Sequence, residues 1–429
     1  MTEFIEIVGG KSLQGTIKAS GAKNAALPML MAALLSEEEV FFQNIPNLLD
    51  VDLTVNLLEQ FGAEVKYAQG NIAVKVPALR AVEASYSLVK ALRASFWVLG
   101  PLLARGRAAR VALPGGDAIG TRPVDIHLNA LTKMGADITL KHGVVFASAV
   151  NGLRPAEIDF SFPSVGATHQ IMMAAALTKG TTVLKGAACE PEVIALADLL
   201  NKMGAKIEGA GTPNVAIVGQ ETLGGAQVSM IGDRIEAGTY LLASVITGGD
   251  LKVEGIDPNH LGDFLEILSN LGATVETSPN SIRVIQKNNI RPINVTTEVF
   301  PGFATDLQAP LMAALTLAEG ESTIEENIFE GRFAHVQELA RMGANINVSD
   351  RTATITGVRN LSGAPIEASD IRGGAALILA GLAAEGVTSI GEIDHIRRGY
   401  EKFDSKLRNL GAQITCRPEE IEDIAAVGC

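Results

Sequence analysis

The sequence predicts an α/β protein of two domains, each made of three copies of one repeat unit. A helix that ends in Gly-Ala and continues into a strand recurs six times, and an apolar helix followed by a turn and a strand recurs between those copies. The length of 429 residues agrees, because it exceeds one typical hydrophobic core and roughly two or three domains are expected.

The Gly-Ala element marks the end of a helix in every repeat. A glycine there suits the left-handed backbone that commonly ends a helix, and the next residues alternate as a strand. These helices carry charge along one side, so we expect them to face solvent. The six copies are LLEQFGAEV (57–65), ALTKMGADI (130–138), LLNKMGAKI (199–207), ILSNLGATV (267–275), ELARMGANI (338–346) and KLRNLGAQI (406–414).

The second element is apolar almost all round its helix, which predicts a buried helix rather than an amphipathic one. Each unit of about 70 residues therefore holds one buried helix, one exposed helix and several strands. The six copies of this element lie at 26–42, 96–113, 170–186, 239–255, 310–326 and 376–392.

Six such units suit either an open solenoid or two closed domains of three. A solenoid usually ends in capping units with a polar outer face, and none of the six units resembles such a cap. We therefore expect one domain at 21–229 and a discontinuous one at 1–20 plus 230–429, with the opening strand (4–8) in the latter. The interface would form a cleft, which is a common place for a ligand.

Composition limits the partners and the compartment. The net charge of −13 disfavours a nucleic-acid or anionic-membrane partner. The N-terminus lacks the pattern of a secretory signal, and the most apolar run (25–35) is too short to span a membrane. Three widely spaced cysteines form no disulfide framework, and the histidines show no HxxxH pair. We expect a cytoplasmic protein without a metal site.

The stretch LPGGDAIGTRPVDIH (113–127) joins a strand to a helix and concentrates reactive groups. Its three glycines indicate a loop that bends tightly or moves. Asp117, Asp125 and Arg122 together suit proton transfer beside a bound anion. The alternative is a surface turn with ordinary charges.

Polar residues also stand at equivalent ends of the other repeats. Lys23 and Asn24 precede the first apolar helix, Arg93 opens the second, and residues 164–166 precede the third. A helix N-terminus attracts anions, which these residues would reinforce. The ordinary explanations are a solvated lysine at 23 and simple capping by the serine at 164. Trp97 is expected in the core.

The second half offers a matching set. Asp306 opens the fifth apolar helix, where a plain N-cap would also explain it. Asp370 and Arg372 open the sixth, and Arg332 and Arg398 lie in nearby loops. Closure of two domains would bring the basic residues of both halves onto one multiply charged ligand, an electrostatic focus inside an acidic protein.

Seven motifs spread along the chain carry a family resemblance when they are taken jointly. The motifs are SGAKNAALP, LRASFWVLGP, LPGGDAIGTRPVDIH, SVGAT, FPGFATDLQAP, FEGRFAHV and HIRRGYEKF. Together they resemble the UDP-N-acetylglucosamine 1-carboxyvinyltransferase family over essentially the whole chain. The resemblance implies two inverted, barrel-like α/β domains, each of three βαβαββ units, with the active site in the cleft between them.

The same resemblance implies a reaction. The enolpyruvyl group of phosphoenolpyruvate would be transferred to the 3′-hydroxyl of UDP-N-acetylglucosamine with release of phosphate, by addition and elimination through a tetrahedral ketal. In the family this is the first committed step of peptidoglycan synthesis.

The resemblance also implies residue roles, with the two substrates as partners and no cofactor. Asp117 would be the general acid and Asp306 the base for the 3′-hydroxyl. Lys23, Arg122 and Arg398 would hold phosphoenolpyruvate, with Asn24 alongside. Arg332, Asp370 and Arg372 would be supporting charges near the reacting centre. The nucleotide-sugar site would be lined by Arg93, Arg122, Pro123, Val124, Asp125, His127, Ser164, Val165, Gly166, Asp306 and Ile328.

One residue departs from the usual pattern of the family. Most members carry cysteine where this chain has Asp117, as general acid and as the group that forms a covalent adduct with phosphoenolpyruvate. A minority of the family carries aspartate and stays active, so the change is interpreted as a functional variant.

Two other functions remain as alternatives. The sister family, 5-enolpyruvylshikimate-3-phosphate synthase, shares the implied fold and chemistry, but the RPVDIH and FEGRFAHV motifs favour the nucleotide-sugar enzyme. A non-catalytic, UDP-sugar-binding paralogue would explain the loss of the cysteine, but it need not keep Lys23, Arg122, Asp306 and Arg398.

The Asp117 substitution predicts an acidic pH optimum relative to the cysteine form. A carboxyl donates a proton only when it is protonated, and its reference pKa of about 3.9 must be raised by closure over an anionic substrate. The pH–rate profile measures this. A flat rate from about pH 5.5 to 9 would count against Asp117 as the acid.

The same substitution predicts resistance to fosfomycin, because the epoxide of this drug alkylates the thiolate of the family and a carboxylate replaces that thiolate here. Activity after preincubation with the drug should stay constant with time. Time-dependent inactivation would contradict the prediction.

Overall fold

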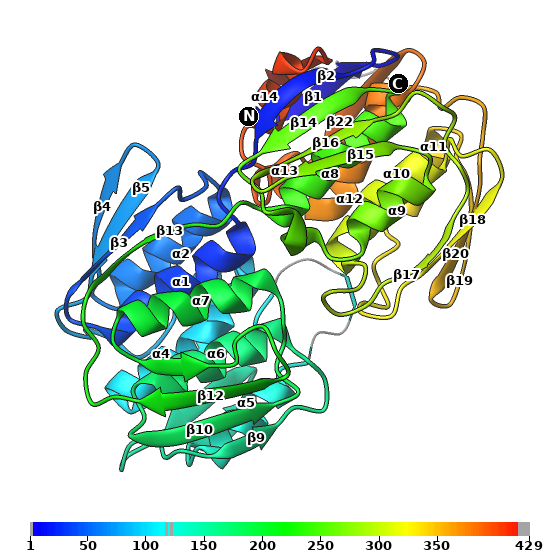
Figure 1. Cartoon of the computed structure of the whole chain (residues 1–429). Helices are drawn as coiled ribbons and strands as arrows, with labels where there is room; N and C mark the ends of the chain where they lie inside the picture. The colour runs from blue at the N-terminus through cyan, green and yellow to red at the C-terminus, as the bar shows by residue number, and fades with distance from the viewer. Residues whose placement is uncertain (1–2, 116–118, 121–122, 419–429) are drawn as a thin grey trace, which may run out of the picture.

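The computed structural model describes residues 3–115, 119–120 and 123–418, which form two α/β lobes (Figure 1). Each lobe encloses its own hydrophobic cluster. The first cluster draws on residues from Ala22 to Met230, and the second draws on residues from Ile5 to Ala19 and from Ile235 to Ile414. These clusters support the boundaries 21–229 and 1–20 plus 230–429, which we propose as the two domains.

The first lobe contains three repeats. Its sheets have the strand orders β13-β3-β5-β4, β6-β8-β7 and β11-β12-β10-β9. In chain order its main elements are α1 (Lys23–Ala32), β3 (Glu39–Gln43), α2 (Leu49–Gln60), β4 (Glu64–Ala68), β5 (Asn71–Lys75), α3 (Tyr86–Ala91), β6 (Ala108–Ala112), α5 (Asp125–Lys133), β7 (Asp137–Lys141), β8 (Val144–Ser148), β9 (Glu157–Asp159), α6 (Val165–Ala176), β10 (Gly180–Lys185), α7 (Pro191–Lys202), β11 (Lys206–Glu208), β12 (Asn214–Gly219) and β13 (Ala226–Ser229).

The second lobe repeats the same plan. Its sheets have the strand orders β15-β16-β14-β2, β17-β18-β20-β19 and β21-β22-β1-β23. Its main elements are β1 (Glu3–Val8), β2 (Gln14–Lys18), α8 (Arg234–Ile246), β14 (Asp250–Glu254), α9 (Phe264–Asn270), β15 (Thr274–Ser278), β16 (Ser281–Ile285), β17 (Asn294–Thr296), α10 (Gln308–Leu315), β18 (Glu321–Glu325), α11 (Val336–Arg341), β19 (Asn345–Ser349), β20 (Thr352–Thr356), β21 (Pro365–Glu367), α12 (Ile371–Ala383), β22 (Val387–Gly391), α13 (Asp394–Arg397), α14 (Phe403–Asn409) and β23 (Gln413–Pro418).

The N-terminal strand closes the last repeat. β1 pairs antiparallel with both β22 and β23, in the sheet position that β12 holds in the third repeat. The edge strands of the first and fourth repeats are exchanged, because β13 pairs with β3 while β2 pairs with β14. The chain therefore passes twice between the lobes, near residues 19–22 and 230–233, and a β-bridge joins Gly21 and Gly232.

The predicted helix ends are confirmed. The six glycines of the Gly-Ala element have φ angles between 91° and 110°, the left-handed region that a glycine enters without strain. The predicted layering holds for most of the helices: every residue of α10 is buried, whereas α5 buries one side and exposes the other. α1, α6, α8 and α12 are likewise buried over most of their length. The prediction is wrong for α7, a helix of the Gly-Ala element that packs against α1 and α6 and has eight of its 12 residues buried.

One apolar helix differs from the prediction of a continuous element. Residues 93–106 form the 3₁₀ helix η2 (Arg93–Val98), the short α4 (Leu99–Pro101) and the π-helix η3 (Leu102–Gly106). Pro101 has no backbone N–H, so it cannot donate the α-helical hydrogen bond to the carbonyl oxygen of Trp97, and regular α-helical bonding is interrupted at this point. Arg93 still opens the helical stretch.

Gly21 lies where the chain crosses between the lobes, and we predict that a side chain at this position destabilises the fold. A Cβ on Gly21 would lie 2.0 Å from the carbonyl oxygen of Asn44, so Gly21→Ala should lower the free energy of unfolding by about 2 kcal/mol. Urea denaturation measures the change. Gly224→Ala is the matched control, because its Cβ would meet no atom closer than the carboxylate of Glu38, at 3.5 Å. Equal unfolding midpoints for both variants would contradict the prediction.

Candidate active site

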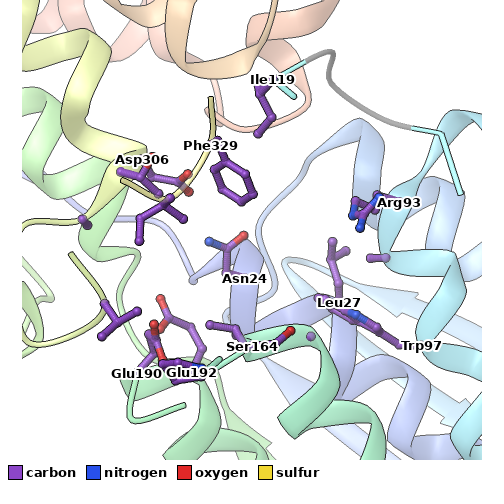
Figure 2. A pocket seen from close by; sticks show the side chains of 18 of the residues that line it. Asn24, Leu27, Arg93, Trp97, Ile119, Ser164, Glu190, Glu192, Asp306 and Phe329 are labelled. Atoms are coloured by element: carbon purple, nitrogen blue, oxygen red, sulfur yellow. The ribbon is translucent and has the colours of Figure 1, made fainter. Parts of the chain in front are cut away.

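A cavity of about 570 Å³ lies between the two lobes and is lined by residues of both (Figure 2). Figure 2 shows Arg93 and Trp97 on one side, Asp306 on the other, and Asn24 between them. Asp117 and Arg122 lie outside the described residues. The predicted site residues that line the cavity are Lys23, Asn24, Arg93, Pro123, Val124, Asp125, His127, Ser164, Val165, Gly166, Asp306, Ile328, Arg332, Arg372 and Arg398.

Lys23 and Arg398 come from different lobes and share one carboxylate. Lys23 Nζ lies 3.1 Å from Asp50 Oδ2, and Arg398 Nε lies 2.8 Å from Asp50 Oδ1. Asp50, in the first turn of α2, is 3% exposed, and Lys23 is also buried. The alternative of a solvated lysine at position 23 is therefore wrong. The carboxylate holds two cations at the wall of the cavity, where they can receive an anion.

Asp306 lies between two buried guanidinium groups. Its Oδ1 accepts a hydrogen bond from Arg332 Nη2 at 2.6 Å, and its Oδ2 accepts one from Arg372 Nη2 at 3.1 Å. Burial alone would raise the pKa of Asp306, but the charges of Arg332 and Arg372 outweigh burial and hold it well below its usual range. Asp306 is thus ionised and faces the cavity, and it does not cap its helix as a plain N-cap would.

The buried carboxylate of Glu326 organises the loops around Asp306. It accepts hydrogen bonds from Thr297 Oγ1 at 2.8 Å, Thr305 Oγ1 at 2.9 Å and the N–H of Ile328 at 2.9 Å. Thr305 Oγ1 in turn accepts a bond from Arg332 Nη1 at 2.8 Å. This network fixes both the backbone near Ile328 and the guanidinium that binds Asp306.

Asp370 lies behind the cavity wall. It does not line the cavity; it caps α12, and its Oδ1 accepts hydrogen bonds from the N–H groups of Arg372 and Gly373 at 3.0 and 2.9 Å. Asp370 thus fixes the start of the helix that carries Arg372. Its role as a supporting charge near the reacting centre stays a prediction.

The N-terminus of α6 opens into the cavity. Ser164 caps the helix by accepting a bond from the Ala167 N–H at 3.3 Å, which leaves the N–H groups of Val165 and Gly166 without an acceptor in the described chain. A Cβ on Gly166 would lie 2.7 Å from Trp97 Nε1, so only glycine fits here. Trp97, expected in the core, packs against the core and also forms part of the cavity wall.

Sequence reasoning missed several residues of the cavity. Asp50 carries no motif beyond its place in a helix, and only the structure brings it to Lys23. Glu190 and Glu192, at the start of α7, line the floor with Arg234 of the other lobe. Glu192 Oε1 accepts a bond from Arg234 Nε at 2.9 Å, a contact between lobes that no local pattern signals.

The described end of the 113–123 loop also contacts the other lobe. The N–H of Gly331 donates to the carbonyl oxygen of Ile119 at 3.1 Å, and a Cβ on Gly120 would collide with the carboxylate of Glu330 at 2.8 Å. The loop and the second lobe therefore meet above the cavity.

The described residues hold no group of three or more histidine, cysteine, aspartate or glutamate side chains placed to bind a metal ion. Among those same residues, every helix is too short or too polar to cross a bilayer.

The described residues thus form two lobes of three repeats with a cavity between them, lined by paired cations and by the ionised carboxylate of Asp306, which suits anionic ligands. The family model of EPSP synthase (3-phosphoshikimate 1-carboxyvinyltransferase) matches residues 7–407. The chain belongs to this family of enolpyruvyl transferases.

Curated relatives of the chain carry a more specific name. This chain is 49% identical over 421 residues to the UDP-N-acetylglucosamine 1-carboxyvinyltransferase of Rhodopseudomonas palustris, a match that covers 96% of this chain and 98% of the relative. It is 50% identical over 423 residues to the protein of that name from Afipia carboxidovorans, with the same coverage.

Solved structures agree on the fold. The enolpyruvyl transferase NikO of Streptomyces tendae superposes with a TM-score of 0.87 at 26% identity, covering 98% of this chain and 100% of NikO. An EPSP synthase of Acinetobacter baumannii has a TM-score of 0.74 at 19% identity, covering 97% of this chain and 100% of that one, and shows the fold alone.

Proposed function

We propose that the protein transfers the enolpyruvyl group of phosphoenolpyruvate to the 3′-hydroxyl of UDP-N-acetylglucosamine and releases phosphate, as a step of peptidoglycan synthesis. The observation that carries the proposal is the convergence of Lys23, Arg398, Asp306 and the α6 N-terminus on one cavity between the lobes. Relatives named UDP-N-acetylglucosamine 1-carboxyvinyltransferase are 49% and 50% identical to this chain over 96% of its length, which supports UDP-N-acetylglucosamine as the acceptor.

The two substrates would occupy different walls. Lys23 and Arg398, already close through Asp50, suit the carboxylate and phosphate of phosphoenolpyruvate, and Arg122 would join them. The open N–H groups at the start of α6 and the guanidinium of Arg93 suit the diphosphate of the nucleotide sugar. Pro123, Val124, Asp125 and His127 would then face the nucleoside.

The chemistry requires one acid and one base. Asp117 would protonate the methylene carbon of phosphoenolpyruvate, which gives C2 cationic character, and the sugar oxygen would attack C2. Asp306 would take the hydroxyl proton in that step. Each oxygen of Asp306 accepts one bond from a guanidinium group, and a carboxylate oxygen keeps a further lone pair that can accept the hydroxyl proton. The tetrahedral ketal then loses a proton and phosphate.

The finer assignments follow from the same proposal. The partners are the two small molecules, and the compartment is the cytoplasm, in keeping with the free thiols of Cys189 and Cys416. A non-catalytic paralogue and a synthase that uses shikimate 3-phosphate are the competing functions.

The test is the release of phosphate from phosphoenolpyruvate with and without UDP-N-acetylglucosamine, in the wild type and in Asp117→Ala. Release should depend on the nucleotide sugar and be abolished by the substitution. Release that survives Asp117→Ala would move the proton donor elsewhere. Release only with shikimate 3-phosphate, or nucleotide-sugar binding without any release, would favour one of the competing functions.

Asp50→Asn should lower kcat/KM for phosphoenolpyruvate about 10²-fold, since Lys23 and Arg398 lose the carboxylate that sets their spacing. Binding of UDP-N-acetylglucosamine alone, measured by calorimetry, should change little. Asp52→Asn is the matched control, because Asp52 lies in the same helical turn but is exposed. Unchanged phosphoenolpyruvate kinetics in Asp50→Asn would show that the ion pairs do not position the substrate cations.

A further inference from the structure

A buried chain of two hydrogen bonds runs behind the cavity and ends on His127. Gln170 of α6 is fully buried, and its Nε2 donates to the carbonyl oxygen of Phe96 at 3.0 Å. Its Oε1 lies 2.6 Å from His127 Nδ1. His127 is also nearly buried, and the edge of its ring meets the ring of Phe96 at a centroid distance of 5.6 Å.

The direction of each bond in this chain is determined. The carbonyl of Phe96 can only accept, so the amide of Gln170 must direct its NH₂ group there and its oxygen to the histidine. An amide oxygen can only accept, so Nδ1 of His127 must carry a proton. In a neutral imidazole, the other nitrogen, Nε2, then holds a lone pair.

His127 is neutral in this environment. Burial, with a smaller contribution from the charge of Arg93 on η2, lowers the pKa of His127 to about 4. The bond to Gln170 and the charge of Asp125 on α5 act in the opposite direction and are outweighed. His169, the other titratable group nearby on α6, is itself buried with a pKa lowered to about 4, so it adds no charge.

Nε2 lies beside the start of α6. His127 lines the cavity, and a Cβ on Gly166 would lie 3.4 Å from Nε2 and 3.2 Å from Cε1. The lone pair is therefore next to the open end of α6, where the proposed nucleotide binds. A lone pair attracts an N–H or O–H group, which the nucleoside offers and the ionised diphosphate at the α6 N–H groups does not.

We propose that Gln170 is a positioning residue, which holds His127 in the Nδ1–H tautomer so that Nε2 accepts a hydrogen bond from an N–H or O–H group of the bound nucleoside. The identity of the ligand rests on the proposed function; the tautomer does not. Through His127, Gln170 thereby selects a ligand that presents a hydrogen-bond donor, rather than an acceptor, at this point of the cavity.

The direct test is ¹⁵N NMR of histidine-labelled protein without ligand, with the His127 signals assigned from His127→Asn. The wild type should show Nδ1 protonated and Nε2 unprotonated from about pH 6 to 8. In Gln170→Met, which is similar in size and offers Nδ1 only a weak thioether acceptor, part of the population should carry the proton on Nε2. Protonated Nε2 in the wild type, or an unchanged spectrum in Gln170→Met, would overturn the proposal.

Kinetics supply the second readout. Gln170→Met should raise KM for UDP-N-acetylglucosamine about fivefold, the effect of one neutral hydrogen bond, and leave kcat within about twofold. Met173→Leu, a conservative change of a buried residue one turn further along α6, is the control and should leave both constants unchanged. An equal rise in KM for both variants would assign the effect to helix packing and overturn the proposal.

Gln170→Glu tests the same idea through pH. Its carboxylate also accepts from Nδ1, but it raises the pKa of His127 by favouring the imidazolium, whose Nε2–H is a donor. KM for the nucleotide sugar should therefore fall in this variant as pH rises from about 6 to 8, while the wild-type KM stays level. A level profile in a folded Gln170→Glu protein would contradict the proposal. If neither variant nor wild type uses UDP-N-acetylglucosamine, the proposed function fails and the NMR result still decides the tautomer.

Discussion

The carboxylate of Asp233 connects the two lobes at the point where the chain crosses between them. Its Oδ1 caps α8 by accepting from the N–H groups of Ile235 and Glu236, and its Oδ2 accepts from the N–H of Lys23, the first residue of α1, at 3.0 Å. One buried side chain thus sets the starts of two apolar helices in different lobes. Because Lys23 belongs to the cavity wall, the junction of the lobes also determines where a substrate cation stands.

Charge pairing around the cavity, within and between the lobes, prepares it for anions. Asp50 holds Lys23 and Arg398, Asp306 holds Arg332 and Arg372, and Glu192 holds Arg234. Buried charges require such partners, since an isolated ion pays a large desolvation penalty. The pairs fix the cations in place before ligand binding, which reduces the reorganisation that an anionic substrate demands. The net charge of the chain is negative, so this local arrangement, not the overall field, attracts the substrates.

Local sequence patterns predicted some side chains well and others poorly, for physical reasons. Asp306 and Asp370 both precede an apolar helix and suit an N-cap equally, yet only Asp370 caps, because Arg332 and Arg372 hold the carboxylate of Asp306. Pro101 was visible in the sequence, but its effect on residues 93–106 depends on how the broken helix packs. Asp50 and Gln170 have no motif, and they matter through partners 27 to 348 residues away.

The sequence alone determined the six repeats, the two classes of helix and the glycines at which helices end. These are local properties, because they depend on the hydrophobic period of a segment and on the left-handed backbone that a glycine adopts at the end of a helix. Its motifs also indicated the family. Tertiary structure decided which strand completes which sheet, which carboxylate pairs with which cation, and which nitrogen of His127 carries the proton. These depend on contacts between residues far apart in the chain, whose geometry exists only once both lobes have folded together.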